Sequence, residues 1–194
     1  MLTDQPRRVG KTHRRTTPTR WLMTDRRLGN AAVVARIVAR MPPRSGIIIR
    51  PYAMGTSDVA QQIRIIRRIA TARRHCVLIA GGQRFGGGWA GVHGIPASRH
   101  ARDRTLLSLP VHDAREAARA VRLGAAISLV SPVFATRSHP GAMQLGQRGF
   151  ARLGARTSGK IIALGGMDAV RFRTLRRHGA HGWAAIDAWL PQNP

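Results

Sequence analysis

The sequence predicts an α/β fold, a compact (β/α)8 TIM barrel with some abbreviated helices. Short apolar runs alternate with helical patterns until eight strands are counted, and strands separated by helices pair in parallel. No Gly-x-Gly-x-x-Gly motif follows the first strand, which disfavours the alternative, a doubly wound open sheet. Roughly 175 residues shared among eight units leave about 22 for each, at the short end for this barrel.

The expected strands are short runs of apolar residues bounded by glycine or polar turns. They cover residues 21–24, 46–50, 76–80, 91–93, 106–112, 125–130, 160–164 and 182–186. Apolar residues at helical spacing predict helices at 31–40, 57–73, 113–122, 148–155 and 169–177. The third and fourth connections, which contain residues 86–88 and 95–103, offer at most a helical turn.

Two of these helices carry recognisable end signals. Asp113 is a suitable N-cap, and Glu116 three residues later completes a capping box. Asp168 is placed to cap the last helix, which follows a Gly-Gly turn. Gly124 and Gly179 stand where glycine commonly ends a helix.

The chain is long enough for one domain with a substantial core, expected over residues 21–190. Residues 1–20 have little apolar content and many arginines and threonines, so they are expected to form a basic, disordered tail. Cys76, the single cysteine, excludes an internal disulfide. There is no apolar run long enough to span a bilayer and no secretory signal, so a cytoplasmic protein without membrane contact is expected.

The formal net charge of +25 allows two interpretations. A positive field attracts phosphates, as in proteins that bind polyanions. Alternatively, the charge reflects a generally basic composition, because nearly all of it is arginine spread through the expected helices. The chain has one tyrosine and no signature of a nucleic-acid-binding fold, so nucleic acid is not expected as a partner.

In a parallel barrel the chemistry belongs at the carboxyl ends of the strands. The polar and glycine residues at those ends are Asp25, Arg50, Gly81-Gly82, His93, His112, residues 136–139, Gly165-Gly166 and Asp187. Gly165 and Gly166 allow a phosphate to approach the backbone at the start of a helix. The hydroxyls of Thr136 and Ser138 can bind an anion in the loop after the sixth strand. For His93 and His112 a hydrogen-bonded place in the barrel wall is favoured over catalysis.

Six motifs in order resemble the thiamine-phosphate synthase and thiazole tautomerase superfamily over about residues 21–190. Ser131–Gly146 resembles the family's GPVF-x-T-x-T-K-PGA-x-x-LG loop, with His139 in place of the lysine. The other motifs are residues 21–25 (YL-[IV]-TD), 91–93 (the start of GVHLGQ), 111–117 (S-x-H-x-x-x-EA), 162–167 (AIGGI) and 179–186 (GADGVAVI).

This resemblance implies a transferase of thiamine biosynthesis that joins hydroxymethylpyrimidine diphosphate to thiazole phosphate and releases diphosphate. It therefore implies phosphorylated small molecules as substrates. The residues placed on the diphosphate are Arg50, Thr136, Ser138 and His139, the last three as the catalytic group. Gly165, Gly166 and the backbone of Ala185 and Ile186 are placed on the thiazole phosphate.

The metal site of the family has no counterpart in the sequence. Family members hold Mg²⁺ with aspartates after the third and fourth strands. This chain has Ala80-Gly81-Gly82 at the first place and no acid before Asp103 at the second. Mg²⁺ prefers anionic oxygen ligands, so no preformed metal site is predicted. Arg84, Arg99 or Arg102 could neutralise the diphosphate instead, as guanidinium groups do elsewhere.

Other functions stay open beside the synthase. A thiazole tautomerase needs neither diphosphate nor metal; its histidine is replaced by Pro132, although His139 lies nearby as a displaced proton carrier. A catalytically inactive barrel that binds a phosphorylated ligand is the third possibility. Asp187 also has two interpretations: a carboxylate at the phosphate end that needs an arginine to screen it, or an outward N-cap of a final turn.

Overall fold

Eight parallel strands close into a barrel in chain order, so that β1 also pairs with β8. The computed structural model describes residues 16–51, 59–81, 89–95, 106–138 and 141–190. The strands are β1 (Arg20–Met23), β2 (Gly46–Ile49), β3 (Cys76–Ala80), β4 (Gly91–His93), β5 (Leu106–Val111), β6 (Ile127–Val130), β7 (Lys160–Leu164) and β8 (Gly182–Ala185). The TIM barrel predicted from the sequence is confirmed.

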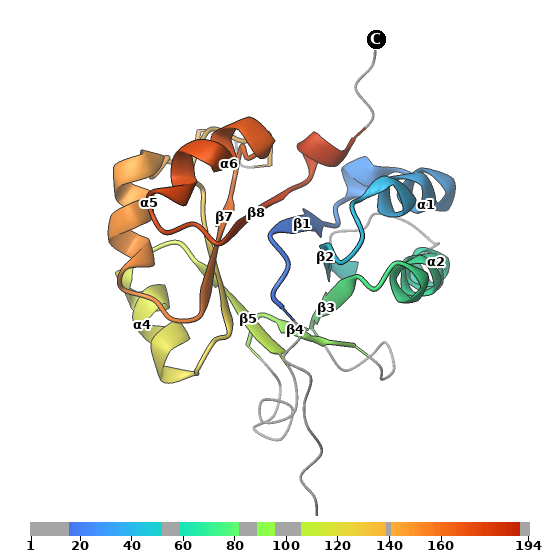
Figure 1. The fold of residues 1–194 in the computed structure, drawn as a ribbon, viewed down its shortest axis with the longest axis horizontal. Helices are drawn as coiled ribbons and strands as arrows, with labels where there is room; N and C mark the ends of the chain where they lie inside the picture. The colour runs from blue at the N-terminus through green and yellow to red at the C-terminus, as the bar shows by residue number, and fades with distance from the viewer. Residues whose placement is uncertain (1–15, 52–58, 82–88, 96–105, 139–140, 191–194) are drawn as a thin grey trace, which may run out of the picture.

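Five α-helices surround the strands in the described part of the chain. They are α1 (Ala31–Arg40), α2 (Val59–Ala72), α4 (Ala114–Arg122), α5 (Gly146–Gly154) and α6 (Ala169–Arg176). In Figure 1, α1 and α2 cover one side of the barrel and α4, α5 and α6 the opposite side. All five match the predicted helices within two residues. None of the helices described is long and apolar enough to cross a membrane. The connections expected to be abbreviated include residues 82–88 and 96–105, which lie outside the described residues.

The start of β6 differs from the prediction, which began this strand at residue 125. The backbone N–H of Ala125 donates to the carbonyl of Ala120 in α4, at 2.9 Å, and therefore still belongs to the turn that ends the helix. Ala126 donates to Leu107 at 2.9 Å, and the strand begins at Ile127. Gly124 in this turn has a φ of 64°, the left-handed conformation expected of a helix C-terminal glycine.

The N-caps of α4 and α6 form as predicted, but the capping box of α4 is incomplete. Asp113 accepts a hydrogen bond from the Glu116 N–H at 2.8 Å, and Asp168 accepts from the Arg171 N–H at 2.7 Å. The Glu116 carboxylate accepts instead from the N–H of His112, one residue before the cap, at 2.7 Å. The same oxygen lies 2.7 Å from Nδ1 of His112, and this second partner accounts for the shift.

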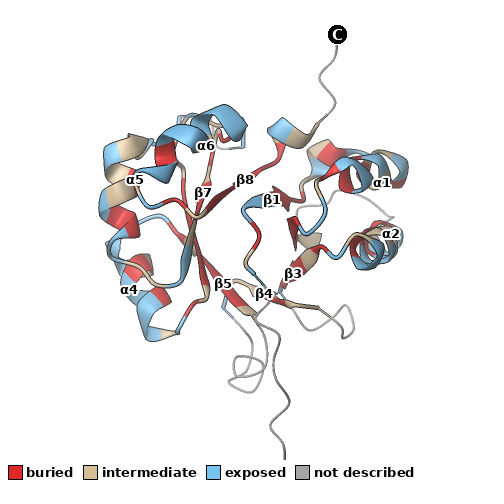
Figure 2. Cartoon of the chain, viewed as in Figure 1, coloured by how far each residue is buried: buried red, intermediate tan, exposed pale blue. Residues whose placement is uncertain are grey.

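The apolar core has two parts. One joins β1–β3, α1 and α2 with Ile127, Leu129, Ile162 and Ala184, and the other lies around β5–β8 with α4–α6. Figure 2 shows the strands largely buried and the helices exposed on their outer faces. Trp21 is fully buried, and its indole N–H donates to the carbonyl of Pro18 at 2.8 Å. Because both clusters are anchored on the strands, the strand ends are rigid platforms for the loops that follow them.

The barrel closes between its first and last strands. The N–H of Trp183 in β8 donates to the carbonyl of Thr19, and Nε2 of His181 donates to the carbonyl of Thr17, each at 2.9 Å. After β8 the chain forms a short 3-10 helix, η3 (Asp187–Trp189). Trp189 stacks on Trp183 with ring centroids 5.3 Å apart, and its indole N–H donates to the carbonyl of Trp21 at 3.0 Å. Of the expected basic tail, residues 1–15 lie outside the described residues.

Candidate functional site

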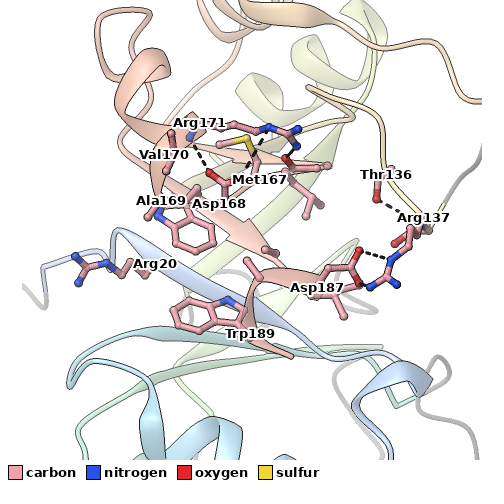
Figure 3. Close-up of a pocket in the computed structure, with 18 of the residues that line it drawn as sticks. Arg20, Thr136, Arg137, Met167, Asp168, Ala169, Val170, Arg171, Asp187 and Trp189 are labelled. Carbon is pink, nitrogen blue, oxygen red and sulfur yellow. Dashed lines mark hydrogen bonds and ion pairs between the residues drawn. The ribbon is translucent and has the colours of Figure 1, made fainter. Parts of the chain in front are cut away.

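The loops after β6, β7 and β8 line one cavity of about 700 Å³. Figure 3 shows Thr136 and Arg137 facing Asp187 on one side of it, with Met167 to Arg171 on another. The lining also includes Arg20 and Trp189. Six of the predicted site residues line this cavity together: Thr136, Ser138, Gly165, Gly166, Ala185 and Ile186.

The turn after β7 requires glycine at both positions. Gly165 and Gly166 have φ values of 93° and 59°, which side chains with a Cβ rarely adopt. A Cβ on Gly165 would lie 2.8 Å from Cα of Pro132, and one on Gly166 would overlap the carbonyl oxygen of Ala135. The β6 and β7 loops are also joined through their backbones, since Val133 donates to Leu164 at 2.9 Å. The two loops therefore form one rigid wall.

An arginine that the sequence analysis did not single out stands beside this turn. The guanidinium of Arg171 donates to the carbonyl oxygen of Gly166 and lies over the Phe134 ring, 5.2 Å from its centroid. Arg171 is in the first turn of α6, three residues after the Asp168 cap. It brings a positive charge to the glycine turn, where an anion would approach the backbone.

Arg50, at the end of β2, is held by the end of β1. Its backbone N–H donates to the Thr24 hydroxyl at 2.8 Å, and its Nε donates to the Thr24 carbonyl at 3.0 Å. Its Nη2 lies 3.4 Å from the Asp25 carboxylate. Arg50 is not among the described residues that line the cavity of the β6–β8 loops, and its Asp25 partner connects it to Arg27.

Arg27 makes that connection and was also missed. Its Nε donates to Asp25 at 2.9 Å, its Nη1 to Asp187 at 2.8 Å, and its Nη2 to the Ser138 hydroxyl at 2.6 Å. The single guanidinium thereby joins loops after β1, β6 and β8. Asp25 also accepts from the Arg27 backbone N–H at 3.0 Å, which caps the short 3-10 helix η1 (Arg26–Leu28) and fixes the side chain's direction.

Of the two interpretations of Asp187 that the sequence left open, the outward N-cap is wrong. Ile186 takes the cap position of η3, and no side chain bonds there. The Asp187 carboxylate instead accepts from Nη1 of Arg27, and from Nε of Arg137 at 3.1 Å and Nη2 of Arg137 at 3.0 Å. The alternative interpretation, a carboxylate screened by arginine, describes this arrangement.

The arginines alter the protonation equilibria at the mouth. Burial raises the pKa of the Asp25 carboxyl, but the hydrogen bonds and charge of Arg27, with the charge of Arg50, outweigh it, and the pKa falls below its ordinary value. The hydrogen bond and charge of Asp187 raise the pKa of the Arg137 guanidinium. Asp25 is therefore ionised, and Arg137 charged, at neutral pH.

The two histidines at strand ends differ in environment. His93 is partly buried at the end of β4, with Nδ1 3.2 Å from the Ser108 hydroxyl. Burial, together with the charges of Arg50 and His112, lowers the pKa of His93 to about 4. His112 is exposed and pairs with Glu116. His93 is thus a neutral group of the barrel wall at physiological pH.

The structure does not locate several of the residues that the sequence analysis named. His139 lies outside the described residues, as do Arg84, Arg99 and Arg102. Ser138 and Thr136 are neighbours on the β6 loop, where the Ser138 N–H lies 3.3 Å from the Thr136 hydroxyl. Within the described part of the chain, no three His, Cys, Asp or Glu residues form a group that could hold a metal ion.

Comparison with known proteins places these features in context. A sequence model of the family described as thiamine monophosphate synthase matches residues 22–189. Thiamine-phosphate synthase of Chloroflexus aurantiacus is 33% identical over 95 residues, 48% of this chain and 44% of that protein. Putative thiamine-phosphate synthase 2 of Aquifex aeolicus is 28% identical over 85 residues, 44% of this chain and 46% of that protein. The matched segments thus span less than half of either relative.

Solved structures of the same fold are similar over most of the chain. Thiamine phosphate pyrophosphorylase from Pyrococcus furiosus superposes with a TM-score of 0.72 at 20% identity, covering 90% of this chain and 88% of that one. The N-acetylmannosamine-6-phosphate 2-epimerase of Clostridium perfringens has a TM-score of 0.57 at 11% identity, covering 89% and 87%. At these identities the likeness concerns the fold alone.

Proposed function

The chain belongs to the thiamine monophosphate synthase family, and from this premise we propose that it joins hydroxymethylpyrimidine diphosphate to thiazole phosphate and releases diphosphate. The observation that carries the proposal is the shared cavity of the β6, β7 and β8 loops. It combines hydroxyl groups, a double-glycine turn and arginine side chains, the chemistry that binds two phosphorylated substrates side by side.

The proposed thiazole phosphate position is the turn after β7. Gly165 and Gly166 bring the backbone within reach of a phosphate, and the start of α6 follows directly. The backbone of Ala185 and Ile186 borders the same cavity from β8. Arg171, held against the Gly166 carbonyl, supplies positive charge there.

The proposed diphosphate position is the β6 loop. Thr136 and Ser138 carry hydroxyls that can donate to phosphoryl oxygens, and His139 follows them in the sequence. Arg50 stands at the far side, linked through Asp25 and Arg27. In the reaction the bond from the pyrimidine methylene carbon to the diphosphate oxygen breaks, and the thiazole nitrogen forms a new bond to that carbon. Cationic groups aimed at the departing oxygens lower the barrier to this step.

Mg²⁺, which the family uses, does not fit the carboxylates of the described residues. Asp25 and Asp187 are bound by arginines, and Asp113 and Asp168 cap helices. Glu116 accepts from His112. A hard divalent cation needs several oxygen ligands at one place, and these carboxylates are dispersed. The roles above therefore rest on side chains and backbone alone.

The test is the formation of thiamine phosphate by the purified protein supplied with both substrates. Protein-dependent product is expected. Ser138→Ala should lower kcat/KM by about tenfold or more, because the leaving group loses one hydrogen-bond donor. Ser158→Ala is the matched control; its hydroxyl bonds to the Ala120 carbonyl near the amino end of β7, and kcat/KM should not change. Absence of product from folded protein would exclude the synthase, and tautomerase and ligand-binding assays would then decide between the other two functions.

A further inference from the structure

The Asp187 carboxylate is bound in the way that arginines bind a phosphoryl group. Arg137 donates to both of its oxygens, at 3.0 and 3.1 Å, and Arg27 donates to one of them at 2.8 Å. Planar guanidinium groups recognise carboxylate and phosphate with the same forked geometry. Figure 3 shows the Arg137–Asp187 pair at the rim of the cavity, next to Thr136.

The position also contains a hydroxyl from the proposed diphosphate loop. Ser138 Oγ lies 2.6 Å from Nη2 of Arg27, so this arginine contacts Asp187 and the loop at once. Two arginines, from the loops after β1 and β6, therefore contact one carboxylate, and Ser138 contacts one of these arginines. A phosphoryl group at the same place would meet the same donors.

The charges at the mouth favour an anion over a cation. Two guanidinium groups, those of Arg27 and Arg137, share the single Asp187 carboxylate. Release of Asp187 from its partners would leave Arg137, which lines the cavity, and Arg27, which contacts the lining residue Ser138, without this negative charge. A side chain can rotate out of such a pair readily, because the Asp187 side chain is 37% exposed.

The geometry points to a metal-independent anion subsite, formed by Arg27 and Arg137, that binds the diphosphate group. The Asp187 carboxylate occupies this subsite until the diphosphate displaces it. This inference rests on the proposed function for the identity of the ligand. In this subsite two guanidinium groups take the place of the family's metal-binding acids, which this sequence lacks at the matching positions. Asp187 acts as an internal competitor that keeps the arginines paired when no substrate is bound.

Isothermal titration of EDTA-treated protein with inorganic pyrophosphate tests the subsite without any reaction. The wild-type protein is expected to bind pyrophosphate equally well with and without Mg²⁺. Arg27→Gln and Arg137→Gln should each weaken binding by about tenfold or more, since each removes a charged hydrogen-bond donor. Arg119→Gln removes the same charge from the exposed surface of α4 and should leave the affinity within about twofold of wild type.

Asp187→Asn gives the result of opposite sign and does not depend on the stability of the arginine variants. The amide removes the competing charge, so pyrophosphate should bind about tenfold more tightly. Weaker binding to Asp187→Asn, or binding that requires Mg²⁺, would overturn the inference, and so would the absence of binding to wild type.

The two proposals can fail separately. Metal-independent pyrophosphate binding without thiamine phosphate formation would reject the synthase and keep the anion subsite. Product formation with pyrophosphate binding that needs Mg²⁺ would do the reverse.

Discussion

Nη1 of Arg27 lies 2.8 Å from the Asp187 carboxylate, although 160 residues separate the two in the chain. Arg27 follows the first strand and Asp187 the last, so this pair joins the two ends of the barrel at its mouth. Because both side chains are partly exposed, water weakens the attraction, and a large contribution to stability is not expected.

A double-mutant cycle with Arg27→Ala and Asp187→Ala should measure a coupling of about 0.5–1 kcal/mol in the free energy of urea unfolding. The coupling should decrease at high salt, because ions screen exposed charges. Arg27→Ala combined with Asp168→Ala, which share no contact, should be additive. A coupling of zero at low salt would contradict the pairing.

Gly166→Ala should destabilise the protein more than Gly141→Ala. Both glycines have positive φ, 59° and 79°, so each alanine costs about 1 kcal/mol in backbone strain. The new methyl at position 166 also meets the Ala135 carbonyl, while nothing lies within 4 Å at position 141. The clash should add about 2 kcal/mol, measured by urea unfolding. Equal losses would show that the β6 loop moves away at no cost.

His93 should make stability fall in mild acid. Its pKa is about 4 in the folded protein against an ordinary value of 6.5, so between these pH values the unfolded chain binds a proton that the folded chain does not. Above pH 6.5 the histidine costs no stability. As the pH falls to 4, it lowers the free energy of unfolding by at most about 3 kcal/mol. The free energy of unfolding of the wild type should therefore fall relative to that of His93→Gln as the pH decreases across this range. Parallel curves would contradict the prediction.

Trp189→Phe should destabilise the protein more than Trp89→Phe. Trp189 stacks on Trp183 and donates to the Trp21 carbonyl, and the smaller ring loses the hydrogen bond and part of the stack. A loss of about 2 kcal/mol is expected in urea unfolding. The indole N–H of Trp89 is buried and makes no hydrogen bond to any described residue, so its replacement removes none. A similar loss in both variants would show that ring size alone matters.

The barrel could be predicted because each strand is marked locally. Residues 76–80, 91–93 and 160–164 are apolar runs between polar or glycine turns, and the strands begin and end exactly there. The start of β6 was misplaced because Ala125 and Ala126 are equally compatible with a strand and with the turn after α4. The hydrogen bond from Ala125 to Ala120 assigns Ala125 to the turn, and no local sequence pattern predicts that bond.

The site could be predicted only in part, for a related reason. Gly165, Gly166, Thr136 and Ser138 belong to recognisable loops, and they line one cavity. Arg27 is one of 33 basic residues, and its contacts with Ser138 and Asp187 span more than 100 positions. The local signal was the Asp25 cap two residues earlier. This cap restricts the direction of the Arg27 side chain but does not reveal which residues the side chain contacts. Asp187 was ambiguous because only the fold determines which way its side chain faces.

The pairing of β1 with β8 has a consequence during synthesis. The first strand is made early, but its second hydrogen-bonding partner emerges only with residues 183–185. A chain terminated before Gly182 would leave the backbone groups of β1 and β7 unpaired along two open sheet edges. Such products should associate with one another through these edges and be recovered as aggregates, whereas chains that include β8 seal both edges at once.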